Sequence, residues 1–202
     1  MIMRILLVLL FTITLGANDK KDDGWVSLIG KNLDNWQGNV KADIKLKDGE
    51  IQLLSAKKNL WLLHKDEFAN FELEVEAFMP EGAYNSGIGF RCQMKGKKVL
   101  GFQCEIDKKK SGAIYSIGKG WVLPKNKNLW GEFYKVAGDC FKDNQWNKFR
   151  IRCVGKKIEI WVNGVKTADV ESTHYTKGRI AIQHHGKGGL HRFRNIRIKK
   201  LP

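Results

Sequence analysis

One short segment of the sequence combines an amide and two carboxylates in a pattern that could support chemistry. Gln103, Glu105 and Asp107 occupy alternate positions and so point to one face of a predicted β-strand. The intervening residues are apolar and are expected to enter a core: Phe102, Cys104 and Ile106. A solvated strand face usually mixes Lys, Thr and Ser with Glu, whereas no Lys or Arg interrupts this row. We therefore interpret the row as the floor of a site that holds a substrate or a metal ion.

The segment before this strand alternates in the same way and supplies further candidates. Its apolar positions are Ile88, Phe90 and Cys92. The opposite face carries Gly87, Gly89 and Arg91, and the two glycines leave room for a ligand. Arg91 could therefore bind an oxyanion of the substrate, or it could pair with Glu105. Asn85 could line the site or shape the turn before Gly87.

Two adjacent histidines end a third alternating segment. His185 is in phase with Gln183, on the face opposite Ile180 and Ile182, whereas His184 is in phase with the core residues. We therefore predict His185 as the site histidine and His184 as a structural one. A histidine together with two carboxylates suits manganese, zinc or calcium completed by waters. The alternative is a surface histidine at the end of a strand.

Two aromatic residues, Tyr115 and Trp121, are candidates for stacking on a sugar ring. Aromatic side chains more often pack against other residues, so this alternative stays open. Trp121 falls within residues 116–144, which lack clean alternation and contain several Gly and Asn. We expect a long loop region there, and such loops on rigid sheets are common places for binding sites.

The rest of the chain is dominated by strand patterns. Alternation of apolar and polar residues predicts strands over residues 71–77, 87–93, 149–153, 158–162, 180–183 and 195–198. Asn163-Gly164 predicts a tight hairpin turn, because both residues readily adopt positive φ. Helix signals are limited to Leu63–Phe68 and Gly138–Asn144, a turn or two each. These patterns predict an all-β, two-sheet antiparallel sandwich of the jelly-roll type.

The N-terminus has the pattern of a secretory signal peptide, with a basic start, an apolar run and small residues before Ala17. We therefore expect cleavage after Ala17, export to the periplasm or the extracellular space, and one domain over residues 18–202. The mature chain keeps four cysteines. In an oxidising compartment they could form two disulfides, in any of three connectivities, or they could be buried hydrophobic residues. These cysteines are Cys92, Cys104, Cys140 and Cys153.

The whole chain carries a formal net charge of +15. An anionic polysaccharide, an anionic surface or nucleic acid could bind such a chain. The lysines are scattered at predicted turns, however, and no basic helix, zinc finger or basic-aromatic strand motif occurs. We therefore expect a lysine-rich surface and no nucleic-acid partner. After removal of the signal peptide, no segment is long and apolar enough to be predicted as a membrane span.

An ordered set of motifs covers the whole mature chain. The set comprises Trp25–Trp36, Asn85–Arg91, Gly101–Asp107, Ser111–Tyr115, Gly120-Trp121, Gln145–Asn147, Trp161–Val165, Gly178–Gly186 and Phe193–Ile196. Each motif alone is weak, but their order resembles the 3-keto-disaccharide hydrolase family, formerly a domain of unknown function. The resemblance implies a concanavalin A-like, laminarinase-like jelly roll with a carbohydrate site on its concave sheet.

The resemblance also implies an activity, the cleavage of glycosides already oxidised to a ketone at C3. Such a ketone acidifies the C2 proton, so that a base can form an enolate and the C1 substituent can leave by β-elimination. Water can add to the product in a later step. This chemistry requires a base, a group that stabilises the enolate and help for the leaving group, and a divalent metal could supply the stabilisation.

The sequence departs from related patterns at two places. In relatives, the Ile-Tyr at positions 114–115 is often followed by acidic residues, whereas Ser116 and Ile117 follow here. The Glu-x-Asp at positions 105–107 also resembles laminarinase-type glycoside hydrolases, which carry a second catalytic glutamate shortly afterwards. Three lysines occupy that place here. A retaining mechanism, which needs two carboxyl groups about 5–5.5 Å apart, is therefore poorly supported.

Together, the residues and the resemblance predict an exported glycoside-cleaving domain. Glu105 or His185 is the predicted base, and Asp107 binds or orients a metal ion for which Glu105 and His185 are the other predicted ligands. The predicted substrate-binding residues are Asn85, Arg91, Gln103, Tyr115, Trp121 and Gln183. The main alternative is a noncatalytic carbohydrate-binding module on the same fold. A third alternative is a surface domain whose polar face binds another protein.

Overall fold

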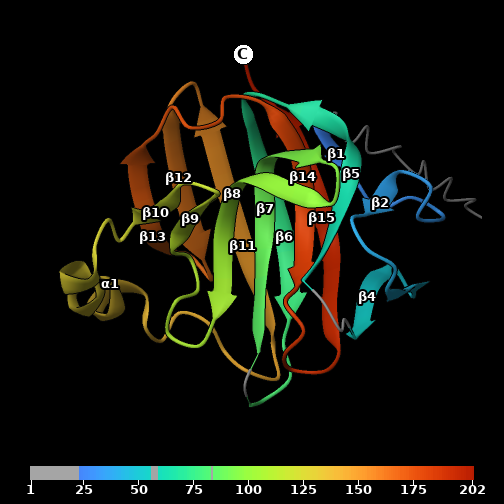
Figure 1. The fold of residues 1–202 in the computed structure, drawn as a ribbon, viewed down its shortest axis with the longest axis horizontal. Helices are drawn as coiled ribbons and strands as arrows, with labels where there is room; N and C mark the ends of the chain where they lie inside the picture. Colours follow the sequence, from blue (N-terminus) through green and yellow to red (C-terminus); the bar gives the residue numbers. More distant parts are fainter. Residues whose placement is uncertain (1–22, 56–58, 83) are drawn as a thin grey trace, which may run out of the picture.

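The computed structural model describes residues 23–55, 59–82 and 84–202 of the chain. Over these ranges the chain forms two antiparallel β-sheets that pack face to face (Figure 1). The predicted all-β sandwich is thereby confirmed. The predicted signal peptide, residues 1–17, lies outside the described residues. Within the described ranges, no helix combines the length and the apolar character needed to cross a membrane.

The two sheets each draw on strands from both halves of the chain. Sheet A has the order β13-β12-β11-β6-β15-β4-β3, with β1 beside β15, and sheet B has the order β10-β9-β8-β7-β14-β5-β2. Sheet A comprises β1 (Trp25–Ser27), β3 (Asp43–Lys47), β4 (Glu50–Ser55), β6 (Phe71–Phe78), β11 (Trp146–Val154), β12 (Lys157–Val162), β13 (Val165–Glu171) and β15 (His191–Lys200). Sheet B comprises β2 (Trp36–Gly38), β5 (Leu60–Phe68), β7 (Asn85–Lys95), β8 (Lys98–Asp107), β9 (Ile114–Ile117), β10 (Gly120–Leu123) and β14 (Gly178–His184).

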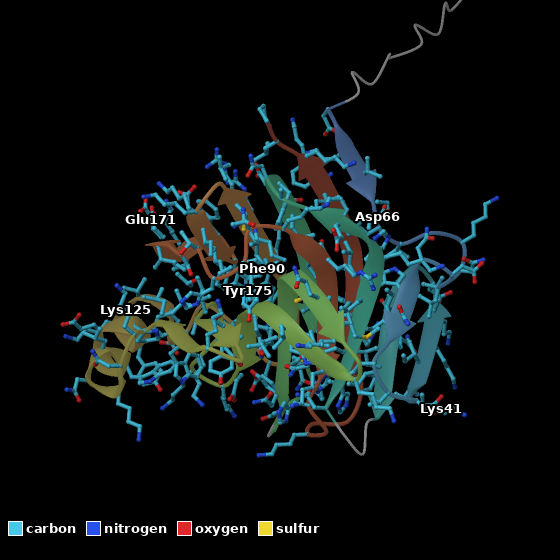
Figure 2. The ribbon with its side chains drawn as sticks, turned by 45° about the horizontal axis from the view of Figure 1, so that its top comes forward. Lys41, Asp66, Phe90, Lys125, Glu171 and Tyr175 are labelled. Carbon is cyan, nitrogen blue, oxygen red and sulfur yellow. The ribbon has the colours of Figure 1, made fainter. Side chains whose placement is uncertain are left out.

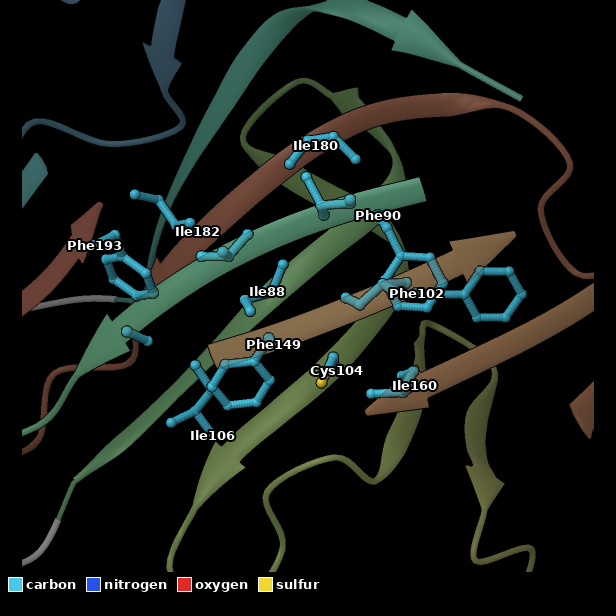
Figure 3. Packing of buried hydrophobic residues seen from close by; sticks show 14 of the residues in the cluster. Ile88, Phe90, Phe102, Cys104, Ile106, Phe149, Ile160, Ile180, Ile182 and Phe193 are labelled. Atoms are coloured by element: carbon cyan, nitrogen blue, oxygen red, sulfur yellow. The ribbon is translucent and has the colours of Figure 1, made fainter. Parts of the chain in front are cut away.

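The core lies between the sheets and is filled by the apolar half of each alternating strand. In β8 the residues predicted to enter the core, Phe102, Cys104 and Ile106, are 0% exposed. They share one cluster with Phe149 and Ile160 from the opposite sheet (Figure 3). The polar half of β8 must therefore point out of the sandwich, on the outer face of sheet B.

The outer face of sheet A is covered by ion pairs between neighbouring strands. The pairs join Glu72 with Arg150, Glu74 with Lys148 and Arg197, and Glu76 with Arg194. Cation–π contacts add to them, because the guanidinium of Arg194 lies 3.9 Å from the ring centre of Trp146. On this face, therefore, every carboxylate of β6 has a cationic partner.

The Asn163-Gly164 turn forms as the sequence predicts. Asn163 has φ 48° and Gly164 has φ 86°, and the two residues join Val162 at the end of β12 to Val165 at the start of β13. Positive φ at both central positions matches the twist of the flanking strands. The turn therefore sets the register of this hairpin locally.

An irregularity in β7 changes which side chains reach the core. The pairing of β7 with β8 shifts between Phe90 and Gln93, and Arg91 there adopts φ 50°. A bulge of this kind interrupts the period-two alternation. As a result Cys92 packs with Trp61 and Ala181 in a small apolar cluster on the outer side of sheet B. The expectation that Arg91 lies on the same face as Gly87 and Gly89 is therefore wrong.

Both helix predictions are wrong. Residues Leu63–Phe68 belong to strand β5, and residues 138–144 form turns. The helix α1 (Trp130–Ala137) forms instead, after a short 3₁₀ turn at Lys127–Leu129, inside the stretch predicted as a long loop. Its apolar residues Phe133 and Ala137 pack onto the core, and such packing stabilises a short helix that propensity alone would not. Strand β10 lies in the same stretch.

All four cysteines are buried and unpaired. Cys104 lies in the main core, whereas the bulge places Cys92 in the outer cluster, so the two cysteines lie on opposite sides of sheet B although the alternation places both on the apolar face. Burial raises the pKa of both thiols. The structure therefore favours the interpretation of these cysteines as buried hydrophobic residues.

We expect the core to be sensitive to truncation far from the candidate site. Ile160→Ala in β12 removes a side chain that is fully buried, and it should lower the free energy of unfolding by about 2–5 kcal/mol. Leu190→Ala, at an exposed position, is the matched control and should cost less than about 1 kcal/mol. Urea denaturation measures both, and equal losses would contradict the packing described here.

Candidate functional site

A hollow of about 200 Å³ opens on the outer face of sheet B. Its lining comprises Asn59, Trp61, Asn85, Gln103, Glu105, Tyr115, Ile117, Trp121, Gln183 and His185. Seven of the nine residues that the sequence predicts as site residues are therefore together here. The other two, Arg91 and Asp107, do not line the hollow.

The register of three neighbouring strands brings the polar residues together. Gly87 of β7 pairs with Gln183 of β14 on one side and with Glu105 of β8 on the other. Side chains of directly paired residues point to the same face of a sheet. Gln183 and Glu105 therefore flank a position that has no side chain of its own, and this gap forms the floor of the hollow.

Gly87 is required because Gln103 lies across it. A Cβ added at Gly87 would come within 2.7 Å of Nε2 of Gln103 and 2.8 Å of its Cγ. Only glycine leaves this space, so Gln103 can reach across β7 towards β14. Gly87 therefore shapes the site by leaving space for the amide of Gln103 on the floor of the hollow.

A chain of amides runs across the floor with a defined direction. Gln103 Nε2 donates to Gln183 Oε1 at 3.1 Å and to the carbonyl oxygen of Ser86 at 3.5 Å. Because a carbonyl oxygen only accepts, the contact with Ser86 assigns the nitrogen of Gln103. Gln183 Nε2 in turn donates to Asn59 Oδ1 at 2.9 Å. Gln103 Oε1 remains to accept from a hydroxyl group of a ligand, and the second N–H of Gln183 remains to donate to a hydroxyl or carbonyl oxygen.

Glu105 is the only acidic residue in this lining. It is 7% exposed, and within the described part of the chain no hydrogen bond or ion pair holds its carboxyl group. Burial is the main cause that raises the pKa of Glu105 to about 8, the negative charge of Asp107 adds to it, and Lys110 opposes it. A carboxyl group with this pKa is a much stronger base than an exposed one, and it titrates in the neutral range.

Asp107 lies at the end of β8 and is not part of the lining of the hollow. Its carboxylate pairs with Lys110 Nζ at 3.3 Å, one of the three lysines that follow it in the sequence. Among the described residues, no three His, Cys, Asp or Glu side chains are close enough to hold a metal ion. Asp107, Glu105 and His185 thus do not form a ready-made metal site, and a bound metal stays a prediction.

The two histidines separate as their phase predicts. His185 is exposed at the rim of the hollow, where its backbone N–H donates to the carbonyl oxygen of Asn85 at 3.1 Å. His184 is buried, accepts from the N–H of Gly186 at Nδ1 and contacts the carbonyl oxygen of Gly189 through Nε2 at 2.7 Å. These contacts anchor the segment that follows His185.

Arg91 is fully buried and does not line the hollow. Its guanidinium donates to the carbonyl oxygen of Ala69 at 2.7 Å from Nη2 and 3.1 Å from Nε, and to that of Tyr175 at 3.2 Å from Nη1. Burial lowers its pKa. The prediction that Arg91 holds a substrate oxygen is therefore corrected: it ties β7 to two connecting segments.

Tyr115 and Trp121 form an aromatic wall beside the acid. They are paired across β9 and β10, with ring centres 5.1 Å apart in an edge-to-face arrangement. Trp130 of α1 also packs edge-to-face against Trp121, with ring centres 4.8 Å apart. The indole thus contacts two aromatic rings while it stays 37% exposed. An exposed, fixed aromatic surface of this kind suits an apolar face of a sugar ring.

Three residues of the lining were not predicted from the sequence: Asn59, Trp61 and Ile117. Trp61 stands in the run Leu60–Leu63, which shows no alternation, and it reaches the site because it pairs with Gln183. Asn59 comes directly before that strand and accepts from Gln183. No local pattern marks either residue, because only strand pairing brings them to the floor.

A β-sandwich with an amide floor, a buried acid and an aromatic wall has the features of a carbohydrate-active domain. Comparison with known proteins supports this class. The profile of the 3-keto-alpha-glucoside-1,2-lyase-like domain matches residues 24–199. The chain therefore belongs to this family, and it is a carbohydrate-active, glycosyl hydrolase-like domain. A search of curated protein sequences gave no match.

Solved structures with the same fold come from enzymes and binding modules alike. A proposed glycosyl hydrolase from Parabacteroides distasonis is similar with a TM-score of 0.66 and 24% identity, over 88% of this chain and 99% of that one. The carbohydrate-binding module CBM66 from Bacillus subtilis is similar with a TM-score of 0.59 and 12% identity, over 82% and 96%. The lumenal domain of VIP36, bound to Ca²⁺ and Man3GlcNAc, has a TM-score of 0.58 and 10% identity, over 90% of both chains. At these identities the likeness establishes the fold.

The buried acid should make stability depend on pH. Glu105 has a pKa of about 8 in the folded state against 4.5 as its ordinary value, so the native state binds more protons between these pH values and stability falls as the pH rises through them. Glu105→Gln removes this loss. The variant should gain roughly 3–5 kcal/mol over the wild type between pH 4.5 and pH 8.5, at about 1.4 kcal/mol for each pKa unit. Denaturant unfolding at both pH values measures it.

Glu132→Gln is the matched control for this measurement. Glu132 lies exposed in the first turn of α1, and its replacement should change stability by less than about 1 kcal/mol at either pH. A wild-type protein and a Glu105→Gln variant with parallel pH dependence would show that Glu105 is not desolvated in solution.

Proposed function

We propose that this domain cleaves 3-keto-glycosides and that Glu105 removes the proton at C2 of the oxidised sugar. The observation that carries the proposal is the isolated carboxyl group of Glu105, buried in a hollow that is otherwise lined by amides, aromatic rings, one isoleucine and one histidine. Membership in the 3-keto-alpha-glucoside-1,2-lyase-like family supports a ketone-bearing sugar as the substrate.

The proposed reaction needs no oxidant or reductant once the ketone is present. The carboxylate of Glu105 takes the C2 proton, and the electrons of the C2–H bond form an enolate with the C3 carbonyl. The enolate then reforms the ketone, a double bond forms between C1 and C2, and the bond from C1 to the leaving oxygen breaks. The departing oxygen takes up one proton. Addition of water across the new double bond would complete a hydrolysis.

The raised pKa of Glu105 suits this role. Proton transfer is most effective when the pKa of the base lies near the working pH, because the base form is then both populated and strong. A pKa of about 8 meets this condition far better than the ordinary value of 4.5. The neighbouring Asp107 contributes to the shift without touching the substrate.

In this proposal, the remaining residues of the hollow stabilise the enolate, bind the sugar and protonate the leaving group. The free N–H of Gln183 and the side chain of Asn59 stabilise the C3 oxygen as it gains negative charge, since donors directed at a developing charge lower the barrier. Gln103 Oε1 accepts from a sugar hydroxyl. His185 at the rim protonates the departing oxygen, and the Tyr115–Trp121 wall orients the ring.

A noncatalytic carbohydrate-binding module is the second candidate. The support for it is the shared fold with CBM66 and with the VIP36 lumenal domain, together with the small size of the hollow. Such a module would bind glycans by the same amides and aromatic rings, and Glu105 would then be a ligand-binding carboxyl group. Turnover distinguishes the two candidates.

The test uses p-nitrophenyl 3-keto-α-glucoside, from which cleavage releases a coloured phenol. The wild type should release it. Because p-nitrophenolate leaves without taking up a proton, His185 does not limit this assay, and kcat/KM should rise with pH with a midpoint near pH 8 as the base form of Glu105 is populated. Glu105→Gln should lower kcat/KM by about 10²–10⁴-fold. The unoxidised glucoside should not be cleaved, because its C2 proton is not acidic.

Asp107→Asn separates the base from its neighbour. Removing the negative charge of Asp107 should lower the pKa of Glu105, so the rising limb of the profile should move to lower pH while activity persists on the plateau. Runs with and without a chelator test the predicted metal in the same assay. Tight binding of the ketone substrate without turnover, with and without added Mn²⁺, Zn²⁺ or Ca²⁺, would refute the enzyme and support the binding module.

A further inference from the structure

A second and larger hollow borders the candidate site at Trp121. Its volume is about 560 Å³, and its lining includes Trp121, Val122, Lys125, Lys156 and the segment Glu171–His174. Trp121 is the residue that the two hollows share. Figure 2 shows Lys125 and Glu171 on the same side of the molecule, near the edge where α1 projects. A ligand that lies over Trp121 could therefore extend from one hollow into the other.

The size of the two hollows indicates a ligand longer than one sugar ring. Sites for small molecules are commonly about 300–1,000 Å³. The hollow at Glu105, about 200 Å³, is below this range, whereas the adjoining one is within it. The first hollow alone suits a single sugar ring. The part of a glycoside beyond the cleaved bond would therefore need space outside it.

The adjoining hollow carries one uncompensated positive charge. Lys156 Nζ lies 2.9 Å from a carboxylate oxygen of Glu171, so these two charges neutralise each other. Lys125 is exposed and, within the described residues, forms no ion pair. The hydroxyl groups of Ser172 and Thr173 lie in the same lining. A cation beside hydroxyl groups favours a sugar with an anionic substituent.

The geometry points to a second sugar subsite in this hollow, in which Trp121 supports the junction between two rings and Lys125 binds a carboxylate or sulfate on the second ring. This inference rests on the proposed function, because it takes the second ring to be the part of a glycoside beyond the bond that Glu105 helps to break. It adds a substrate class to that function, namely glycosides whose leaving group is an acidic sugar.

Binding of unreactive sugars tests the second subsite. Three probes are compared by NMR titration at low salt: methyl α-glucoside, maltose, and the same disaccharide with a C6 carboxylate on its second ring. Both disaccharides should shift the backbone amides of residues 171–174, and methyl α-glucoside should not. The acidic disaccharide should bind about two- to five-fold more tightly than maltose, as expected for one exposed charge pair.

Two charge-matched variants identify the cation. Lys125→Gln should abolish the preference for the acidic disaccharide and leave the affinity for methyl α-glucoside unchanged. Lys95→Gln is the control, because Lys95 is exposed in the β7–β8 hairpin, away from both linings. It should keep the preference. If the two variants had equal effects, Lys125 would contribute only through the net positive charge of the protein. Its proposed role in binding the anionic substituent would then be refuted.

The outcomes separate this inference from the proposed function. Normal cleavage of the 3-keto-glucoside, with no disaccharide-specific shift at residues 171–174, would refute the second subsite and leave the function of Glu105 standing. Disaccharide-specific shifts without any cleavage would support the subsite on a binding module. Binding of none of the three sugars, together with no cleavage, would refute both proposals.

Discussion

The candidate site depends on the register that places Gly87 of β7 between Gln183 of β14 and Glu105 of β8. This pairing leaves a gap in the row of side chains, and Gln103 fills it by lying across the glycine. The same register directs Phe102, Cys104 and Ile106 into the core. Successive side chains of a strand point to opposite faces. A shift in register would therefore change both the packing of the core and the residues on the floor of the hollow. The acid and the amides thus face outward because their neighbours are buried.

The two outer faces of the sandwich use their polar residues differently. On sheet A, each carboxylate of β6 is partly buried and forms an ion pair with a cation on a neighbouring strand. On sheet B, Glu105 is buried without a cation in contact, and its pKa rises for that reason. Isolated buried carboxyl groups destabilise a fold unless they stay neutral, so their presence in a hollow favours a functional explanation.

Much of this could be predicted from local sequence patterns. Alternation identified the central strands β7, β8 and β14 of the site and the face on which Gln103, Glu105, Gln183 and His185 lie, but not β5 or β10. The Asn163-Gly164 turn and the separation of His184 from His185 also follow from local rules. The bulge at Arg91 could not be predicted, since a pattern of alternating residues contains no sign of the extra residue. The helix Trp130–Ala137 was missed because its stability comes from packing on the core.

The sequence by itself determined the fold class, because the alternation of apolar and polar residues requires sheets with one buried face. It also marked Glu105, two amides of the floor and two aromatic residues as candidate site residues. The tertiary structure decided which of them act together. It brought in Asn59 and Trp61 through pairing with β14, removed Arg91 through the bulge and turned Asp107 towards Lys110. These outcomes depend on contacts between segments far apart in the chain, and such contacts have no local signature.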